Sequence, residues 1–219
     1  MNFNLKFITP LLLLTTGPLS VTEAETLQED VAVIKAEPES YALRCVLNGT
    51  PRALAIPLSE QIAVGYDTWR GGVFVIWKPQ NSNQFLSLKG AVYTGAHGPQ
   101  ATTHGSIIFQ EKPTNKSNRY FHSNTNATLH YLGHQVNKSG EITLSFSFRN
   151  TKGQNIGLIQ DRCSVEKNTN FQRHITISNL PAGEEIKIDF PKKLTWSELS
   201  DFQAIIRSNT TTTFSAKLP

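Results

Sequence analysis

The stretch Ile142-Thr-Leu-Ser-Phe-Ser-Phe-Arg149 alternates apolar and polar residues without a break. Because successive side chains of a β-strand point to opposite faces, this alternation predicts a strand with one buried and one solvated face. The same two-residue period recurs at Ile175 and Ile177 and at Ile186 and Ile188. Residues 73–77 (Val-Phe-Val-Ile-Trp) are apolar on both faces, which predicts a strand lying between two layers.

Turn signals such as Asn48-Gly49, Lys138-Ser-Gly140 and Pro181-Ala-Gly183 separate short strands from residue 41 onward. Short strands at this spacing predict an all-β fold, an antiparallel β-sandwich of ordinary or large, supersandwich-like form. At most one short helix is expected, where Thr195 and Glu198 have the spacing of a capping box. Further strands are expected at 31–34, 41–47, 52–57, 61–67, 84–88, 90–95, 105–110, 128–136, 156–166 and 212–217.

The 219 residues divide into three parts. Lys6, an apolar run over residues 7–14 and small residues at Thr22 and Ala24 predict a signal peptide over 1–24. That run is about half of the ~20 apolar residues that a membrane span needs. Residues 25–40 form an acidic leader, and 41–219 form a single β-sandwich domain. We therefore expect a periplasmic or secreted protein without a membrane span.

Two cysteines, Cys45 and Cys163, remain after removal of the signal peptide. An even number of cysteines in an oxidising compartment predicts a disulfide between them. The alternative is a pair of buried free thiols on separate strands.

Catalytic and metal-binding signatures are sparse. His130 and His134 have the spacing of a helical zinc pair, but on a strand they would be ~13 Å apart, so we expect two histidines on one strand face and no metal. Only Glu60 and Asp67 carry carboxylates between residues 42 and 110, and the positive segment 112–138 carries none. We expect no cofactor and no catalytic residue, and the mild net charge of +4 does not indicate nucleic-acid binding.

Aromatic and glycine-flanked polar residues gather in residues 65–105. Glycines permit close approach of the backbone to a ligand, and exposed aromatic rings can stack on sugars. The alternative is that the aromatics pack in the core and that residues 97–100 form a rigid turn. Arg44 and Arg52 are expected to reach the same concavity and to favour an acidic sugar or a partner carboxylate. The expected ligand-binding residues are Tyr66, Asp67, Trp69, His97, Gln100 and His104.

Several motifs together resemble the N-terminal β-rich region of large exported bacterial proteins that also carry c-type cytochrome or sorbosone-dehydrogenase-like modules. They are Arg44-Cys-Val-Leu-Asn-Gly-Thr-Pro-Arg52, Ala63-Val-Gly-Tyr-Asp-Thr68, Val75-Ile-Trp-Lys78, Gly90-Ala-Val-Tyr93, His97-Gly-Pro-Gln100, Leu129-His-Tyr-Leu-Gly133, Gly140-Glu-Ile-Thr-Leu-Ser-Phe146 and Asn179-Leu-Pro-Ala-Gly183. The chain lacks Cys-x-x-Cys-His, so the haem chemistry of those proteins does not carry over. The resemblance implies an exported accessory β-domain near polysaccharides or periplasmic redox proteins.

Three functions follow from these observations. The first is a non-catalytic binding module for a carbohydrate or a partner protein. The carbohydrate would be a polysaccharide, and the partner would be a periplasmic redox or carbohydrate-handling protein. The second is a sugar-active enzyme, epimerase-like or lyase-like, that uses His97, His104 and Asp67. The third is a structural protein that pairs with a partner through a sheet edge. The scarcity of carboxylates favours the first over the second.

Overall fold

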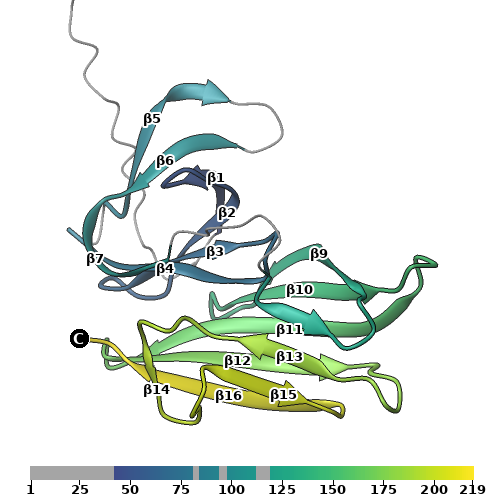
Figure 1. The fold of residues 1–219 in the computed structure, drawn as a ribbon. Helices are drawn as coiled ribbons and strands as arrows, with labels where there is room; N and C mark the ends of the chain where they lie inside the picture. Colours follow the sequence, from purple (N-terminus) through teal and green to yellow (C-terminus); the bar gives the residue numbers. More distant parts are fainter. Residues whose placement is uncertain (1–41, 81–83, 94–97, 112–118) are drawn as a thin grey trace, which may run out of the picture.

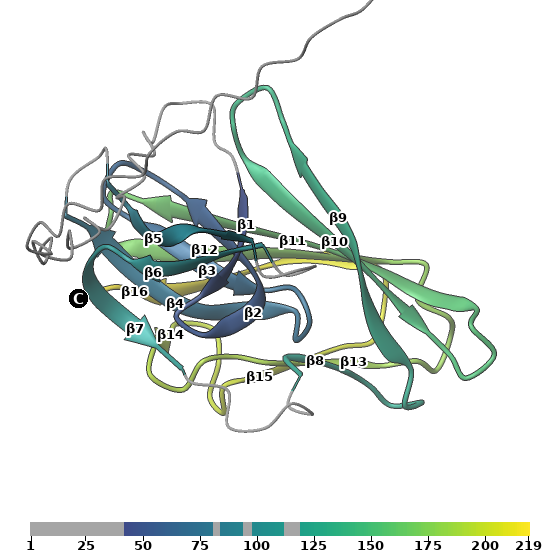
Figure 2. The same ribbon diagram turned by 90° about the horizontal axis from the view of Figure 1, so that it is seen from above.

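Three β-sheets make up the part of the chain that the computed structural model describes, residues 42–80, 84–93, 98–111 and 119–219 (Figures 1 and 2). Within these ranges the structure contains strands and no helix, which confirms the all-β prediction. The signal peptide, the leader, the strand expected at 31–34 and His97 lie outside the described residues. The strands are β1 (Leu43–Leu47), β2 (Thr50–Pro57), β3 (Ala63–Asp67), β4 (Gly72–Pro79), β5 (Leu86–Tyr93), β6 (Pro99–Thr103), β7 (Gly105–Gln110), β8 (Phe121–Ser123), β9 (Thr128–Val136), β10 (Ile142–Arg149), β11 (Asn155–Glu166), β12 (Asn170–Ser178), β13 (Ile186–Asp189), β14 (Thr195–Trp196), β15 (Gln203–Ile206) and β16 (Thr210–Lys217).

The first sheet has seven strands in the order β5-β6-β1-β2-β3-β4-β7 and curls back on itself. Only His104 separates β6 from β7, yet β6 pairs with β1 and β7 pairs with β4. One bent segment, residues 99–110, therefore reaches two strands that lie three positions apart in the sheet. Figure 1 shows the resulting loop of strands, which closes around its own interior. The pairing of β1 with β6 is parallel, whereas the other pairs are antiparallel.

The interior of this curled sheet is a small core of its own. Trp77 and Phe74 fill it, and the Trp77 indole donates a 2.8 Å hydrogen bond to the Phe85 carbonyl. Small residues on the neighbouring strands leave room for these large rings, as they do inside narrow barrels. The alanines that line this core are Ala53, Ala55, Ala63 and Ala101.

The outer face of β2–β4 packs on the second sheet, whose order is β14-β16-β12-β11-β10-β9. Leu54, Val64 and Ile76 meet Phe146 and other apolar residues of the second sheet in a larger core. Other apolar residues of β4 face the interior of the curled sheet. As a result, β4 is buried from Gly72 to Trp77. The prediction that residues 73–77 lie between two layers is therefore confirmed.

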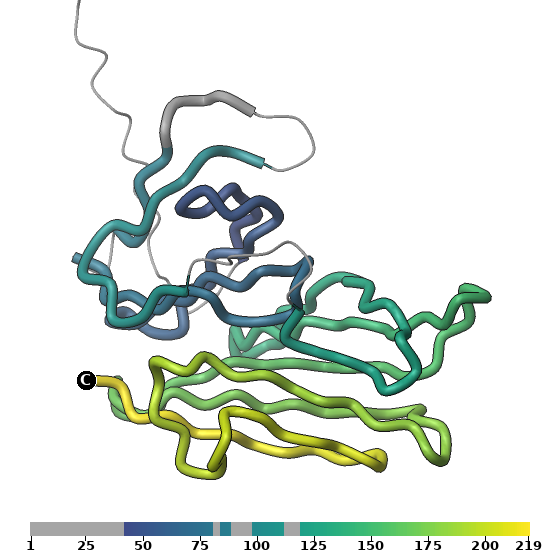
Figure 3. The backbone as a smooth tube through the Cα atoms, in the orientation of Figure 1, coloured from purple at the N-terminus to yellow at the C-terminus, as the bar shows by residue number. Residues whose placement is uncertain are grey.

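The third sheet, in the order β15-β13-β8, lies against the same larger core. Phe121, Ile186 and Ile188 contribute its buried side chains. The tube in Figure 3 shows the curled sheet lying above the other two sheets. All three sheets therefore contribute side chains to one larger core.

The helix expected at Thr195 is not present, because β14 pairs there with β16. Trp196 is buried against the rings of Phe190 and Phe171, and its indole donates to the Pro191 carbonyl at 3.1 Å. Burial of Trp196 on the paired strand stabilises this segment more than a capping box would stabilise a helix. Strands β6, β8 and β15 were not predicted, and the expected strands at 84–88 and 90–95 form the single strand β5 over their described part.

The predicted disulfide is wrong. Cys45 and Cys163 both carry free, buried thiols. Cys45 points into the interior of the curled sheet, whereas Cys163 belongs to the core between the sheets. The wall of the curled sheet separates the two side chains, so the alternative of free thiols on separate strands holds.

Candidate functional site

Tyr66 is fully buried and does not line a surface concavity. Its hydroxyl donates a 2.5 Å hydrogen bond to Oδ2 of Asp161, which also pairs with Arg173 at 2.6 Å. Burial and the neighbouring Asp161 carboxylate raise the pKa of Tyr66 well above its usual range. Burial acts to lower the pKa of Arg173, but Asp161 outweighs it and raises the pKa, so the guanidinium stays charged. Tyr66 thus joins the two sheets instead of binding a ligand.

Asp67 is also buried, and it builds the turn between β3 and β4. Its Oδ1 accepts hydrogen bonds from the backbone N–H groups of Trp69 (2.9 Å) and Arg70 (3.1 Å). Its Oδ2 pairs with the Arg70 guanidinium at 2.5 Å. A carboxylate that accepts backbone donors two and three residues ahead holds a tight turn. Asp67 therefore fixes the position of Trp69.

Trp69, another of the predicted ligand residues, is exposed, with 47% of its surface accessible. The Arg52 guanidinium carbon lies 4.8 Å from the centre of its ring, and that of Arg119 lies 5.3 Å from it. Both distances fall within the range of cation–π contacts. The ring therefore holds two positive charges at one place on the surface.

Gln100 and His104 lie elsewhere in the curled sheet. Gln100 is half-buried on β6, opposite Val46 of β1. His104 occupies the bend between β6 and β7, where its backbone N–H donates to Phe85 and its Nδ1 lies 3.3 Å from the Ser87 hydroxyl. The sequence prediction of one site that contains all these residues is therefore not met.

Asp67 and His104 lie at opposite ends of β4. Asp67 pairs with Gly72 at one end, and Gly105, next to His104, pairs with Pro79 at the other. β4 has eight residues, and the seven steps from its first to its last residue span roughly 23 Å. The two side chains are too far apart to act on one reacting bond, so the structure does not support the sugar-active enzyme that uses His97, His104 and Asp67.

A cavity of about 290 Å³ lies beside the Asp67 turn, between the curled sheet and β9. Arg44 and Leu54 pair directly across β1 and β2, so their side chains share the wall of this cavity. Figure 2 shows the β9–β10 hairpin standing next to the curled sheet. The lining residues are Arg44, Leu54, Thr68, Tyr131, Gly133 and His134.

A β-bulge in β9 brings Tyr131 and His134 to the same side. Tyr131 pairs with Phe146 and His134 with Leu144, and Leu132 is the extra residue between them. Gly133 adopts a φ of +143°, a conformation that glycine allows at such a bulge. The Tyr131 hydroxyl lies 2.9 Å from Nδ1 of His134. The expectation that His130 and His134 share one strand face is therefore wrong, since His130 pairs with Ser147 on the other face.

Arginine side chains gather near this cavity and Trp69. Among the described residues, no carboxylate lies within ion-pair distance of Arg44, Arg52, Arg119 or Arg149. Burial, and then Arg149 and Arg119, lower the pKa of His130, so the charges of these two arginines reach it. We call Arg52, Trp69 and Arg119 the Trp69 shelf.

Sequence reasoning missed Arg119, Tyr131 and His134 as site residues. The acid-free, positive composition of residues 112–138 is the signal that could have indicated them. That composition does not show that β9 lies beside the curled sheet, because the residues that line the cavity from the two sides are far apart in the chain.

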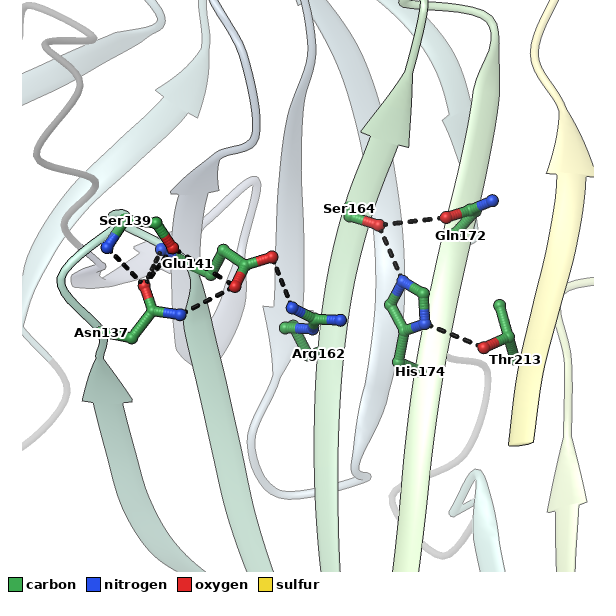
Figure 4. A network of polar contacts seen from close by, with 8 residues as sticks. All are labelled: Asn137, Ser139, Glu141, Arg162, Ser164, Gln172, His174 and Thr213. Atoms are coloured by element: carbon green, nitrogen blue, oxygen red, sulfur yellow. Dashed lines mark hydrogen bonds and ion pairs between the residues drawn. The ribbon is translucent and has the colours of Figure 1, made fainter. Parts of the chain in front are cut away.

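A second polar cluster covers the outer face of the six-stranded sheet (Figure 4). Ser164 lies 2.9 Å from Nε2 of His174, whose Nδ1 lies 2.9 Å from the Thr213 hydroxyl. Burial, and then Arg162, lower the pKa of His174. A serine nucleophile works beside hydrogen-bond donors that point at the developing oxyanion. Here the side chains instead form cross-strand pairs on an open sheet face. We interpret the cluster as sheet surface.

Among the residues that the structure describes, no group of three or more histidine, cysteine, aspartate or glutamate side chains is arranged to hold a metal ion. No helix within the described ranges is long and apolar enough to cross a membrane. No protein-family model, curated protein sequence or solved structure matches the chain.

Proposed function

We propose that this protein is a non-catalytic binding module that holds an acidic carbohydrate on the Trp69 shelf. The observation that carries the proposal is the exposed Trp69 ring with the Arg52 and Arg119 guanidinium groups 4.8 and 5.3 Å from its centre. Guanidinium groups bind carboxylates through two parallel hydrogen bonds, and the flat faces of such a cluster accept the CH surface of a sugar ring. An acidic sugar offers both partners.

The charge distribution favours an anionic ligand over a neutral one. Arg44, Arg52 and Arg119 concentrate positive charge without a carboxylate at ion-pair distance in the described part of the chain. Like charges held close together repel one another, and a bound anion relieves that repulsion. The predicted export of the chain and its resemblance to regions of exported bacterial proteins agree with a polysaccharide ligand outside the cytoplasm.

The backbone of Arg52 supports a binding role for this residue. Its φ of +58° lies in the left-handed region, which costs a non-glycine residue roughly 1–2 kcal/mol. The Arg52 carbonyl accepts hydrogen bonds from the Thr68 hydroxyl at 2.7 Å and from the Thr68 N–H at 3.2 Å. Strained residues of this kind concentrate where a side chain must be held for function.

Pairing with a partner through a sheet edge has weaker support. The edge strand β9 exposes Leu132 and Val136 by 50% and 46%. However, Leu132 lies in the bulge, and Arg119 donates to the Leu129 carbonyl at 3.0 Å. Bulges and capped backbone groups are devices that keep an edge from pairing.

Calorimetry tests the proposal with oligogalacturonates and the matching neutral galacto-oligosaccharides. We expect the wild type to bind the acidic series and to lose affinity as salt is added. Trp69→Ala and Arg52→Gln should each weaken binding at least tenfold, whereas Lys152→Gln, which removes an exposed cation from the β10–β11 turn, should not. Equal affinity for the neutral series, or unchanged binding in both shelf variants, would contradict the proposal.

A further inference from the structure

The cavity between β1–β2 and β9 is small and has both apolar and polar walls. Its volume of about 290 Å³ lies at the lower end of the range for ligand pockets, so it suits one sugar ring and not a longer ligand. Leu54 is buried at 2% exposure and forms an apolar wall, and Tyr131 contributes an aromatic one. Arg44, Thr68 and His134 supply polar groups.

Arg44 supplies a positive charge within reach of this space. Its side chain lines the cavity and is exposed, and its charge acts on the Tyr131 phenol. Burial raises the pKa of Tyr131 to about 12 although Arg44 opposes the shift, so the phenol keeps its proton at neutral pH. The cavity therefore combines a cation with hydroxyl groups, and no carboxylate is among the described residues that line it.

The cavity and the Trp69 shelf adjoin at Thr68. Thr68 lines the cavity and directly precedes Trp69, so their Cα atoms lie ~3.8 Å apart. The Thr68 hydroxyl also donates to the carbonyl of Arg52, which contacts the Trp69 ring. A ligand in the cavity therefore has its next unit within reach of the shelf.

We propose that the cavity is a subsite for one carboxylated sugar ring of the acidic glycan. Its carboxylate pairs with Arg44, its apolar face lies against Leu54 and Tyr131, and its hydroxyls bond to Thr68 and the Tyr131–His134 pair. The neighbouring ring lies on the Trp69 shelf, where Arg52 and Arg119 hold its carboxylate. This inference rests on the proposed function and narrows the ligand to a chain with carboxylates on successive rings.

The test measures binding of galacturonate and trigalacturonate by calorimetry and by amide chemical-shift titration. We expect Arg44→Gln to weaken trigalacturonate binding at least tenfold, and Arg44→Lys to restore part of it because the charge returns without the bidentate geometry. Galactotriose should bind wild type and Arg44→Gln equally weakly. Because Arg44 is exposed, its removal should leave the thermal midpoint unchanged, and Lys152→Gln serves as the matched charge control.

Several outcomes separate the two proposals. If Trp69→Ala weakens trigalacturonate binding but Arg44→Gln does not, the cavity subsite is wrong and the shelf remains. If neither variant changes binding, or if galactotriose binds as tightly as trigalacturonate, both proposals are wrong. If inorganic phosphate binds at Arg44 more tightly than galacturonate does and displaces it, the cavity is a phosphate site and the assignment to carboxylated sugars is wrong.

Discussion

The Tyr66 hydroxyl and the Asp161 carboxylate, 95 positions apart in the chain, form a buried 2.5 Å hydrogen bond between the curled sheet and the six-stranded sheet. Arg173 completes this cluster, since its Nη2 donates to Asp161 at 2.6 Å and to the Gly71 carbonyl at 2.9 Å. Gly71 belongs to the turn that presents Trp69. The buried cluster therefore ties the turn that carries the exposed ring to the centre of the molecule.

Breaking this cluster should cost more stability than any surface ion pair. We expect Asp161→Asn to reduce the free energy of unfolding by about 3–5 kcal/mol, because it leaves the buried Arg173 charge unpaired. Tyr66→Phe should cost less, about 1–3 kcal/mol, because Arg173 still satisfies the carboxylate. Urea denaturation measures both changes.

The pair between Arg162 and Glu141 on the outer sheet face is the control for that experiment, since both side chains are about a third or more exposed. We expect Arg162→Gln to cost about 0–1 kcal/mol. A loss for Asp161→Asn as small as the loss for Arg162→Gln would contradict the central role of the buried cluster.

Phe146 should be one of the largest single contributors to the core. It has no exposed surface and lies 5.9 Å from the ring of Tyr66 and 5.4 Å from that of Tyr131. We expect Phe146→Ala to lower the free energy of unfolding by about 3–5 kcal/mol. A shift of less than about 1 kcal/mol in urea denaturation would show that the ring does not fill the space between the sheets.

The two thiols should be unreactive in the native protein. Burial raises the pKa of Cys45 to about 12 and raises that of Cys163 as well, so neither forms a thiolate at pH 8. We expect no reaction with a thiol-specific disulfide reagent in buffer and two equivalents in urea, with or without prior reduction. Fewer than two equivalents in urea without reduction would instead indicate a disulfide.

Arg52→Gly should separate binding from stability. Glycine adopts the observed φ of +58° without the steric cost that arginine bears, although it also increases the entropy of the unfolded chain. We expect the free energy of unfolding to stay unchanged or to rise by up to about 1 kcal/mol, while affinity for oligogalacturonate falls at least tenfold. Retained affinity would show that Arg52 is not part of the binding surface.

Gly105 should be essential for closing the curled sheet. A Cβ at this position would overlap the Lys78 carbonyl oxygen and lie 2.8 Å from the Gln80 nitrogen, and the φ of +133° excludes most side chains. We expect Gly105→Ala to cost more than 3 kcal/mol, beyond the usual cost of an unfavourable backbone conformation. Gly153→Ala is the control, because its Cβ would meet nothing within 4 Å and should cost only about 1–2 kcal/mol. Equal losses in thermal or urea unfolding would mean that the bend tolerates a side chain.

The sequence by itself determined the strands whose residues alternate and the strand that lies between two layers. Ile142, Leu144 and Phe146 have a local two-residue period, and burial of that face follows wherever the strand docks. Residues 73–77 are apolar on both faces, so only a position between two cores can satisfy them. These features depend on a few neighbouring residues, which is why they could be read without the structure.

Only the tertiary structure decided which residues form the candidate site. The bulge at Leu132 reverses the face of His134 relative to a regular strand, and the pairing of the bent segment 99–110 closes the curled sheet and places Cys45 apart from Cys163. Asp67 was expected to bind a ligand, but it is buried and accepts the hydrogen bonds that hold its turn. Arg119 contacts Trp69 although the two residues are 50 positions apart in the chain. Register, closure and such long-range contacts arise from the packing of distant segments, which no local pattern encodes.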